Sequence, residues 1–347
     1  MAKCRALLLG TGGWAESHAK AYRQCSEIEL VGICGHRNLA RLDALAREYG
    51  VAQGTEVEEM LDRLRPDVLD ISCNPHCRVA PIVAACERPF VRLVNTEKPM
   101  ALIPSEAQTI AERCRATGTL LTVNHQKKYL PAWAKMRRLI ADGTLGNVRF
   151  FRATCQGNAL EQGTHVVDML MHFNGNAPLD WVMGQIDDLD GLSKAGASAP
   201  DSALAEVAFT NGARALLEIG NIGPDYPEET NKWHHFGIMA VGDQGMATVT
   251  LNRTLEVVRF DQGTRTVEPS SWDEHFVAAI TAHLDDVARY AADPTVGHSS
   301  DLDNSLLSFQ ALMGIYASAL NGGRVQFPTT FEDCLVERLI ARAGASS

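Results

Sequence analysis

The sequence predicts an α/β domain with a parallel sheet, followed by an α+β domain with a large, mostly antiparallel open sheet. Three observations lead to this prediction. Short apolar runs alternate with helical patterns over residues 1–123, strand patterns follow one another from residue 147, and a length of 347 residues favours two domains. Strands that alternate with helices of this length are typical of βαβ units, whereas consecutive strands indicate antiparallel pairing.

The first domain is predicted to span residues 1–123. Its apolar runs predict strands at 4–9, 28–34, 68–72, 91–95 and 120–123, separated by helices at about 14–25, 38–49, 77–87 and 105–117. Thr55 and Glu58 have the spacing of a capping box, which predicts one more helix after them. These elements together form a parallel sheet covered on both faces.

The second domain is predicted to span residues 124–347 and to provide substrate binding and oligomerisation. Strand patterns occupy 148–155, 181–186, 203–209, 213–219, 233–241, 246–251 and 255–260, and helices are expected at 131–143, 163–173, 273–292 and 301–320. Asn211-Gly212 lies between two alternating runs, which is a strong signal for a hairpin.

Composition excludes several classes of protein. The net charge is −10, and no long basic run is present, so neither nucleic acid nor an anionic membrane surface is an expected partner. No apolar stretch approaches the roughly 20 residues that span a bilayer. The nine cysteines are scattered and form no Cys-x-x-Cys pair, which favours reduced thiols in the cytoplasm. Since His-Glu-x-x-His and His-x-x-x-His are also missing, we expect no metal site.

A glycine-rich turn joins the first predicted strand to the first predicted helix. Gly10, Thr11, Gly12, Gly13, Trp14 and Ala15 fit the pattern G-x-G-x-x-G/A. The first glycine permits the tight turn, the second lets a pyrophosphate approach the backbone, and the small last residue lets helix and strand pack closely. The alternative is a glycine-rich turn that binds nothing, but the strand-to-helix context favours a Rossmann-type dinucleotide site.

The end of the second predicted strand bears on the choice of cofactor. An acidic residue is expected there for NAD, because it binds the ribose hydroxyls, but residues 34–38 contain none. His36 and Arg37 are available for a 2′-phosphate instead, so NADP is favoured over NAD. The alternative is that both are solvated loop residues.

Two further motifs carry candidate catalytic groups. Glu97-Lys98-Pro99 follows a predicted parallel strand, and ligands bind at the carboxyl ends of such strands. Glu161, His165 and Asp168 have the spacing of one face of a buried helix. A buried histidine needs a partner or a task, and a hydrogen-bonded core histidine is the alternative.

These residues resemble the Gfo/Idh/MocA family, which includes glucose–fructose oxidoreductase and inositol dehydrogenase. The resemblance rests on the turn at 10–15, the strand at 67–74, Glu97-Lys98-Pro99, the segment 126–131 and the helix start at 161–168. It implies an NAD(P)-dependent dehydrogenase that acts on a secondary alcohol of a sugar, inositol or related polyol.

The resemblance also implies roles for individual residues. Lys98 would contact both substrate and cofactor, and His165 would be the general base. Glu161 stands where the family more often has Asp, and Lys128 stands where it commonly has Arg. The predicted cofactor-binding set is completed by Cys73, Asn74, His76, Glu97 and Lys128.

Substrate contacts are predicted just before this helix. Gln156 and Asn158 alternate with apolar neighbours and could line a polyol site, or could be polar residues of an edge strand. Trp233 could stack on a sugar, and strand alternation would send His234 and His235 to opposite faces. Surface positions on the sheet are the alternative for these three.

Two other functions are compatible with the same motifs. One is a redox-cycling enzyme that cleaves or isomerises a glycoside with tightly bound NAD(P), and the other is a non-catalytic NADP sensor. A sensor has no need of a buried base, so the set of Lys98, Glu161 and His165 favours a dehydrogenase.

The sequence of the second domain also predicts that the protein forms a homo-oligomer. A large sheet with helices on one face would leave apolar residues uncovered, and Val207, Phe209, Leu216 and Ile238 are the candidates. We therefore expect a homodimer or homotetramer that packs sheet against sheet.

Overall fold

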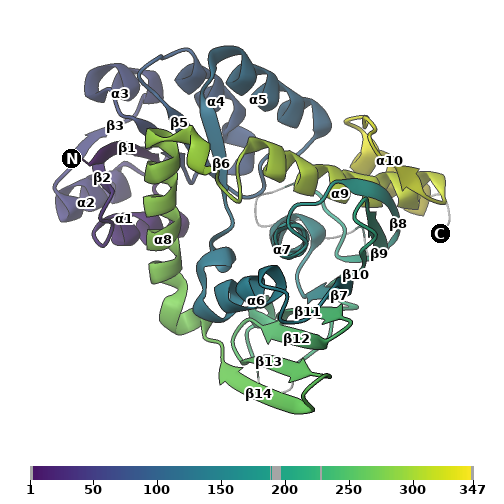
Figure 1. Ribbon diagram of the computed structural model, residues 1–347. Coiled ribbons are helices and arrows are strands. Elements are labelled where there is room, and N and C mark those ends of the chain that lie inside the picture. Colours follow the sequence, from purple (N-terminus) through teal and green to yellow (C-terminus); the bar gives the residue numbers. More distant parts are fainter. Residues whose placement is uncertain (1–2, 188, 190–196, 227–228, 345–347) are drawn as a thin grey trace. The chain divides into compact units, whose positions relative to one another are not determined.

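The computed structural model describes residues 3–187, 189, 197–226 and 229–344 (Figure 1). The chain folds into two compact units. Unit 1 consists of Met1–Tyr129 and Phe276–Ser305, and unit 2 consists of Leu130–His275 and Leu306–Ser347. Each unit is built on one sheet.

Unit 1 contains a six-stranded sheet in the order β3-β2-β1-β4-β5-β6, and every neighbouring pair is parallel. The strands are β1 (Cys4–Leu9), β2 (Ile28–Cys34), β3 (Ala52–Gly54), β4 (Val68–Ile71), β5 (Leu93–Glu97) and β6 (Leu120–Asn124). The predicted parallel sheet is confirmed, and the short edge strand β3 was not predicted. The carboxyl ends of the central strands therefore lie along one edge, where the glycine turn and the Glu-Lys-Pro turn begin.

Helices connect these strands. They are α1 (Gly13–Tyr22), α2 (Leu39–Tyr49), α3 (Val57–Leu64), α4 (Val79–Cys86) and α5 (Pro104–Thr117). The Asn38 side chain caps α2 by accepting a hydrogen bond from the N–H of Arg41. The capping box predicted at Thr55 and Glu58 is wrong, because α3 begins after Glu56 and no side chain caps it.

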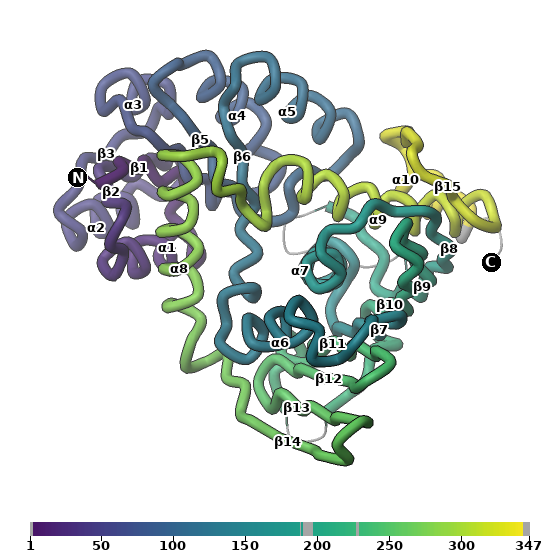
Figure 2. The backbone as a smooth tube through the Cα atoms, viewed as in Figure 1, coloured from purple at the N-terminus to yellow at the C-terminus, as the bar shows by residue number. Residues whose placement is uncertain are grey.

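Unit 1 also includes most of α8 (Trp272–Ala292), which in sequence follows all strands of unit 2 except the last. Ile280, Leu284 and Val287 lie in one buried cluster with residues of β1, β2, β4, β5 and α1. The cluster explains why α8 runs alongside α1 in Figure 2. The first compact unit thus differs from a continuous segment ending at residue 123, since residues 276–305 complete its core.

Unit 2 contains a nine-stranded sheet in the order β14-β13-β12-β11-β7-β10-β9-β8-β15. Only β7 and β10 pair in parallel, so the mostly antiparallel sheet is confirmed. The strands are β7 (Val148–Cys155), β8 (Leu179–Asp187), β9 (Ser202–Phe209), β10 (Arg214–Gly220), β11 (Phe236–Gly242), β12 (Gly245–Thr250), β13 (Thr254–Arg259), β14 (Thr264–Pro269) and β15 (Val325–Gln326). The hairpin at Asn211-Gly212 is confirmed, and Gly212 has a positive φ of 87°.

Helices cover one face of this sheet (Figure 1). They are α6 (Pro131–Ala141), α7 (Thr164–Phe173) and α9 (Leu302–Asn321), and α10 (Leu335–Gly344) closes the described part of the chain. Val207, Phe209 and Ile238 are buried within the unit itself. Their selection as uncovered residues was therefore wrong, because the helices already bury them; Leu216, which is partly exposed, lies on the other side of its strand.

Candidate active site

The glycine turn of unit 1 has the geometry that the sequence predicts. Gly10 has a φ of +137°, and a Cβ there would lie 2.6 Å from the Ser72 hydroxyl oxygen, so only glycine fits. A Cβ on Gly12 or Gly13 would meet nothing within 4 Å. Ala15 is fully buried, which allows α1 to pack closely on the sheet. The turn is thus tight on its inner side and open on its outer side.

The N-terminus of α1 presents backbone N–H groups at this open side. Gly12 is its N-cap residue, and none of the described side chains caps it. Uncapped N–H groups and the helix dipole favour an anion, so the turn fits the pyrophosphate of a dinucleotide. Arg41 from α2 braces the turn: its Nε donates to the Thr11 carbonyl at 2.8 Å, and its guanidinium pairs with Glu16. Trp14, the other residue of the motif, is 40% exposed.

The segment after β2 carries basic groups. His36 and Arg37 are both exposed, and the Asn38 side chain is used as the cap of α2. A Cβ on Gly35 would lie 2.6 Å from the Thr11 side chain, so this segment runs directly beside the glycine turn. His36 and Arg37 therefore follow a segment that adjoins the glycine turn, and their contact with a cofactor remains a prediction.

The end of β4 lies next to the same turn, because the Ser72 N–H donates to the Leu9 carbonyl at 2.9 Å. Cys73 is partly buried, and burial raises the pKa of its thiol. Asn74 and His76 are exposed, and the Asn74 side chain accepts a hydrogen bond from the His76 N–H at 3.1 Å. All three lie at the carboxyl edge of the sheet, and their cofactor contacts remain a prediction.

The Glu-Lys-Pro turn follows β5 and is held from both ends. The buried Arg78 guanidinium donates to the carbonyl of Glu97 and, at 2.7 Å, to the carbonyl of Pro99. Lys98 between them is partly buried. Burial raises the pKa of the Glu97 carboxyl, but the hydrogen bond and the charge of His18, with Lys98 and Arg78 nearby, outweigh burial and lower that pKa overall.

Lys128 lies in a short 3-10 helix after β6. Its ammonium donates to the Ser299 carbonyl and to the Ser300 hydroxyl, both at 2.8 Å. These contacts tie residues 126–129 to residues 276–305 of unit 1. The Tyr129 hydroxyl adds another link, because it donates to an Asp286 carboxylate oxygen at 2.7 Å. A structural role for Lys128 is thus visible, and its predicted cofactor contact remains a prediction.

In unit 2, a π-helical turn over Ala159–Gly163 precedes α7. The Asn158 side chain caps this turn by accepting from the N–H groups of Leu160 and Glu161, at 3.2 and 2.9 Å. Glu161 therefore lies in the π turn, whereas His165 and Asp168 lie in α7. The single helix predicted to carry all three residues is thus a π turn followed by an α-helix. His165 and Asp168 are buried in α7, and Glu161 is partly exposed. Single π turns occur often at functional sites.

Trp233 lies directly over the segment that leads into this turn. A Cβ on Gly157 would lie 2.6 Å from the Trp233 ring and 3.0 Å from the Gln162 side chain. Gln156, partly exposed, is bonded through its N–H to the His235 carbonyl at 2.8 Å. Unit 2 therefore brings Gln156, Asn158, Glu161 and His165 into one segment with Trp233 beside it.

The two histidines after Trp233 do not begin a strand. Lys232–His234 form a 3-10 helix, so the alternation argument for His234 and His235 was wrong. His234 Nδ1 is 3.1 Å from a Glu229 carboxylate oxygen, and His235 Nδ1 accepts from the Tyr226 N–H at 2.8 Å. Both rings stabilise the loop before β11.

Sequence reasoning missed a buried polar cluster below the Glu-Lys-Pro turn. His18 and Asp70 belong to this cluster and Arg78 adjoins it, and all three are buried. One signal was available: polar residues at otherwise apolar strand and helix positions, such as Asp70 within Val68–Ile71.

No group of three or more His, Cys, Asp or Glu side chains among the described residues could hold a metal ion. None of the helices in the described ranges is long and apolar enough to cross a membrane.

Comparison with known proteins points to one family. Residues 4–125 match the Gfo/Idh/MocA model, described as an oxidoreductase family with an NAD-binding Rossmann fold. D-glucoside 3-dehydrogenase of Escherichia coli K12 is 29% identical over 152 residues, which cover 42% of this chain and 41% of that protein. The scyllo-inositol 2-dehydrogenase (NAD(+)) of Bacillus subtilis 168 is 24% identical over 172 residues, covering 49% and 48%. Each match thus spans less than half of the relative's length.

Solved structures extend the likeness in fold to nearly the whole chain. An oxidoreductase from Agrobacterium radiobacter, solved with NAD+, L-tartaric acid and magnesium, has a TM-score of 0.78 at 17% identity and covers 94% of this chain and 98% of its own. The WlbA dehydrogenase from Bordetella pertussis, solved with NADH and UDP-GlcNAcA, has a TM-score of 0.73 at 21% identity, with coverages of 94% and 100%. At these identities the likeness establishes the fold of both units.

Proposed function

We propose that this protein is an NAD(P)-dependent dehydrogenase of a sugar, inositol or related polyol, because residues 4–125 match the Gfo/Idh/MocA model of oxidoreductases with an NAD-binding Rossmann fold. The observation that carries the proposal is the combination of an open glycine turn at the uncapped N-terminus of α1 with Lys98 in the turn after β5. His165 in α7 supplies the candidate base.

The residues of unit 1 fit a dinucleotide. Gly12, Gly13 and the first N–H groups of α1 would hold the pyrophosphate, because a side chain at either glycine would otherwise occupy that space. Cys73, Asn74 and His76 would line the same edge of the sheet. When bound, the nicotinamide supplies the hydride acceptor or donor, and the chain supplies positioning and charge.

The proposed chemistry divides between two side chains. The imidazole of His165 takes the proton of the substrate hydroxyl as hydride leaves its carbon, a task suited to a group that titrates near neutral pH. The ammonium of Lys98 stabilises the negative charge that develops on that oxygen. Glu161 is one π turn before His165 and would orient the substrate or the base, with Gln156 as a further hydroxyl partner.

We propose NADP as the preferred cofactor. The exposed pair His36 and Arg37 follows β2 beside the glycine turn, and residues 34–38 contain no acid that would repel a 2′-phosphate. A guanidinium forms strong, charge-assisted hydrogen bonds with phosphate oxygens.

A panel experiment tests the function. Purified protein is incubated with sugars and inositols and with NAD+ or NADP+, while absorbance of the reduced nicotinamide is followed. Net reduction of NAD+ or NADP+ in the presence of one substrate class supports the proposed dehydrogenase activity. Product formation without net reduction would show redox cycling instead, and cofactor binding without any product would show a sensor.

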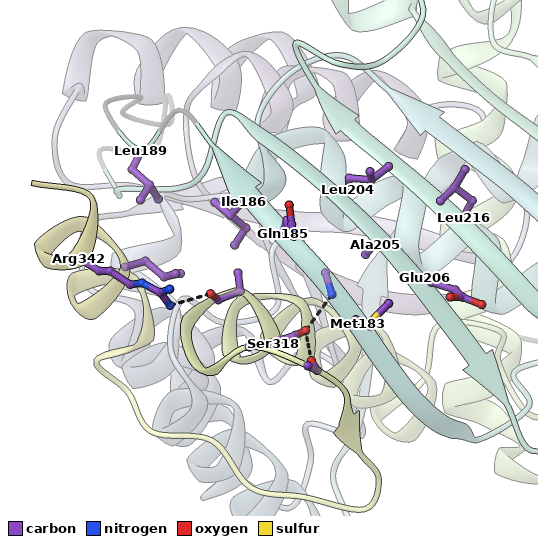
Figure 3. Close-up of a pocket in the computed structure, with 15 residues that line it drawn as sticks. Met183, Gln185, Ile186, Leu189, Leu204, Ala205, Glu206, Leu216, Ser318 and Arg342 are labelled. Atoms are coloured by element: carbon purple, nitrogen blue, oxygen red, sulfur yellow. Dashed lines mark hydrogen bonds between the residues drawn. The ribbon is translucent and has the colours of Figure 1, made fainter. Parts of the chain in front are cut away.

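We also propose that unit 2 forms a homodimer or homotetramer through the open face of its sheet. Met183 and Leu204, on the neighbouring strands β8 and β9, are 41% and 45% exposed, and Phe150 on β7, two strands from β9, is 36% exposed. Figure 3 shows Met183, Leu204 and Leu216 beside a groove of about 730 Å³. Light scattering at micromolar concentration should give at least twice 37.7 kDa, and a monomer mass would overturn this assignment.

The cysteines favour a reducing compartment, and we propose the cytoplasm. All nine are free thiols, and only Cys334 is exposed. The sulfur atoms of Cys86 and Cys114 lie 3.9 Å apart and are not joined by a disulfide bond. Thiols kept reduced in this way are typical of cytoplasmic proteins.

A further inference from the structure

A cluster of buried polar side chains lies under the Glu-Lys-Pro turn in unit 1. Its members come from five elements of the unit, and each is at most 5% exposed: His18 and Tyr22 (α1), Asp70 (β4), Asn95 and Glu97 (β5), Thr122 and Asn124 (β6) and His283 (α8). Burying two carboxylates requires compensation by charge and by hydrogen bonds. A cation within the cluster would supply that compensation.

His18 occupies the centre of this cluster between the two carboxylates. Its Nδ1 lies 2.7 Å from an Asp70 oxygen, and its Nε2 lies 3.0 Å from a Glu97 oxygen. A neutral imidazole has one donor and one acceptor, and an ionised carboxylate only accepts. Both contacts can be hydrogen bonds only if His18 carries two protons or if one carboxyl is protonated.

The other contacts of the carboxylates decide between these two possibilities. Asp70 accepts from the Tyr22 hydroxyl at 2.9 Å and from the Asn95 amide at 2.8 Å. Glu97 accepts from the Asn124 amide at 2.5 Å, and the same amide nitrogen lies farther, at 3.1 Å, from His18 Nε2. Donors thus converge on both carboxylates, which is the arrangement that favours their ionised forms. The second proton consequently belongs on His18.

Charges around the cluster agree with this assignment. Burial lowers the pKa of His18, but the charges of Asp70 and Glu97 and their hydrogen bonds outweigh burial and raise that pKa to about 10. Lys98 and Arg78 face Glu97 from the turn and from the start of α4. On α8, burial together with His298 and His18 holds the pKa of His283 well below its ordinary value, so His283 adds no charge.

We propose that His18 is a permanently protonated positioning residue, which fixes Glu97 and thereby the turn that carries Lys98. His18 and Asn124 hold the Glu97 side chain from below, while Arg78 holds the backbone on both sides of Lys98. This role rests on the proposed function, since it acts through the lysine that stabilises charge on the substrate oxygen. His18 itself touches neither substrate nor cofactor in this role.

The charge of His18 is measured on the wild-type protein. Nitrogen NMR of histidine-labelled protein, with His18 assigned by triple resonance, should show both ring nitrogens protonated and no titration from about pH 6 to 9, because the flanking carboxylates hold the proton. A neutral tautomer, or a titration midpoint inside that range, would overturn the proposal. This measurement needs no substrate, so it is decided even if no alcohol is oxidised and the proposed function fails.

The positioning role is measured by coupling to Lys98. His18→Gln should lower kcat about 10- to 100-fold, as expected when a catalytic group is displaced by roughly an ångström. In a Lys98→Met background the same change should lower kcat less than about threefold, since the group it positions is already gone. Equal losses in both backgrounds would show a merely structural role.

Two further variants keep this test decisive. Tyr22→Phe removes a hydrogen bond from Asp70 and leaves Glu97 untouched, so it should change kcat by less than about threefold. If His18→Gln does not fold, Asn124→Ser removes the other donor to Glu97 without leaving a buried charge unpaired. Its loss of kcat should likewise disappear in the Lys98→Met background, and persistence of that loss would contradict the proposal.

Discussion

Replacing Arg37 with alanine should abolish the proposed preference for NADP over NAD. Arg37 follows β2 and is exposed to solvent. The perturbation is therefore confined to one charge, because Arg37 belongs to no buried cluster. NADH lacks the 2′-phosphate, so its affinity should be unaffected.

The exposure of Arg37 sets the size of the effect. Two unit charges about 4 Å apart in water attract by about 1 kcal/mol. A phosphate monoester carries about −1.5 to −2 charges near neutral pH, which gives about 1.5–2 kcal/mol. That free energy corresponds to an increase of about 10- to 30-fold in the Kd for NADPH.

Titration calorimetry with NADPH and NADH checks the prediction. Arg47→Ala is the matched control, since Arg47 lies near the end of α2 and its side chain is 77% exposed. The NADPH preference should also shrink in about 1 M salt, where the Debye length falls to roughly 3 Å. Equal affinities of the wild type for NADPH and NADH, or equal losses of both in Arg37→Ala, would refute the reasoning.

Three further outcomes are expected. Lys98→Met should fold and bind cofactor but lose about 10²–10³-fold in kcat, as for a removed oxyanion donor; near-wild-type turnover would leave Lys98 without a catalytic role. His165→Asn should lose most of kcat/KM and the acid limb of the pH–rate profile; if its melting temperature falls and the limb persists, His165 is a core residue. Folding raises the pKa of the fully buried His18 from an ordinary 6.5 to about 10. Its stabilisation is therefore fully present below pH 6.5 and is lost as the pH rises through 10. Urea titrations of wild type and His18→Gln should show their unfolding free energies converging between pH 8 and 10, by about 1.4 kcal/mol per unit; a constant difference would contradict the imidazolium.

Local patterns were sufficient to predict most of the fold. Apolar runs identified every described strand of four or more residues except β14, and the hairpin at Asn211-Gly212 was confirmed. Strand β14 was not predicted, because all its residues are exposed and its sequence therefore shows no alternation of apolar and polar residues.

The candidate site was only partly predictable. The glycine turn and the Glu-Lys-Pro turn are continuous motifs, and their geometry followed from their neighbours in sequence. The π turn before His165 differs from an α-helical turn because its backbone hydrogen bonds span one more residue. Hydrophobic periodicity does not resolve that difference. The cluster around His18 joins residues up to 265 positions apart in the chain (18 to 283), so only the fold reveals it.

The return of α8 to the core of unit 1 bears on how this protein can be dissected or recombined. A fragment that stops at Tyr129 would leave Ile28, Val68 and Leu93 facing water where Ile280 and Leu284 now pack. Such a fragment should aggregate, although it contains the whole segment that matches the dinucleotide-binding family. A chimera that exchanges the nucleotide-binding part must therefore carry residues 276–305 with it, and the smallest transferable module is discontinuous in the gene.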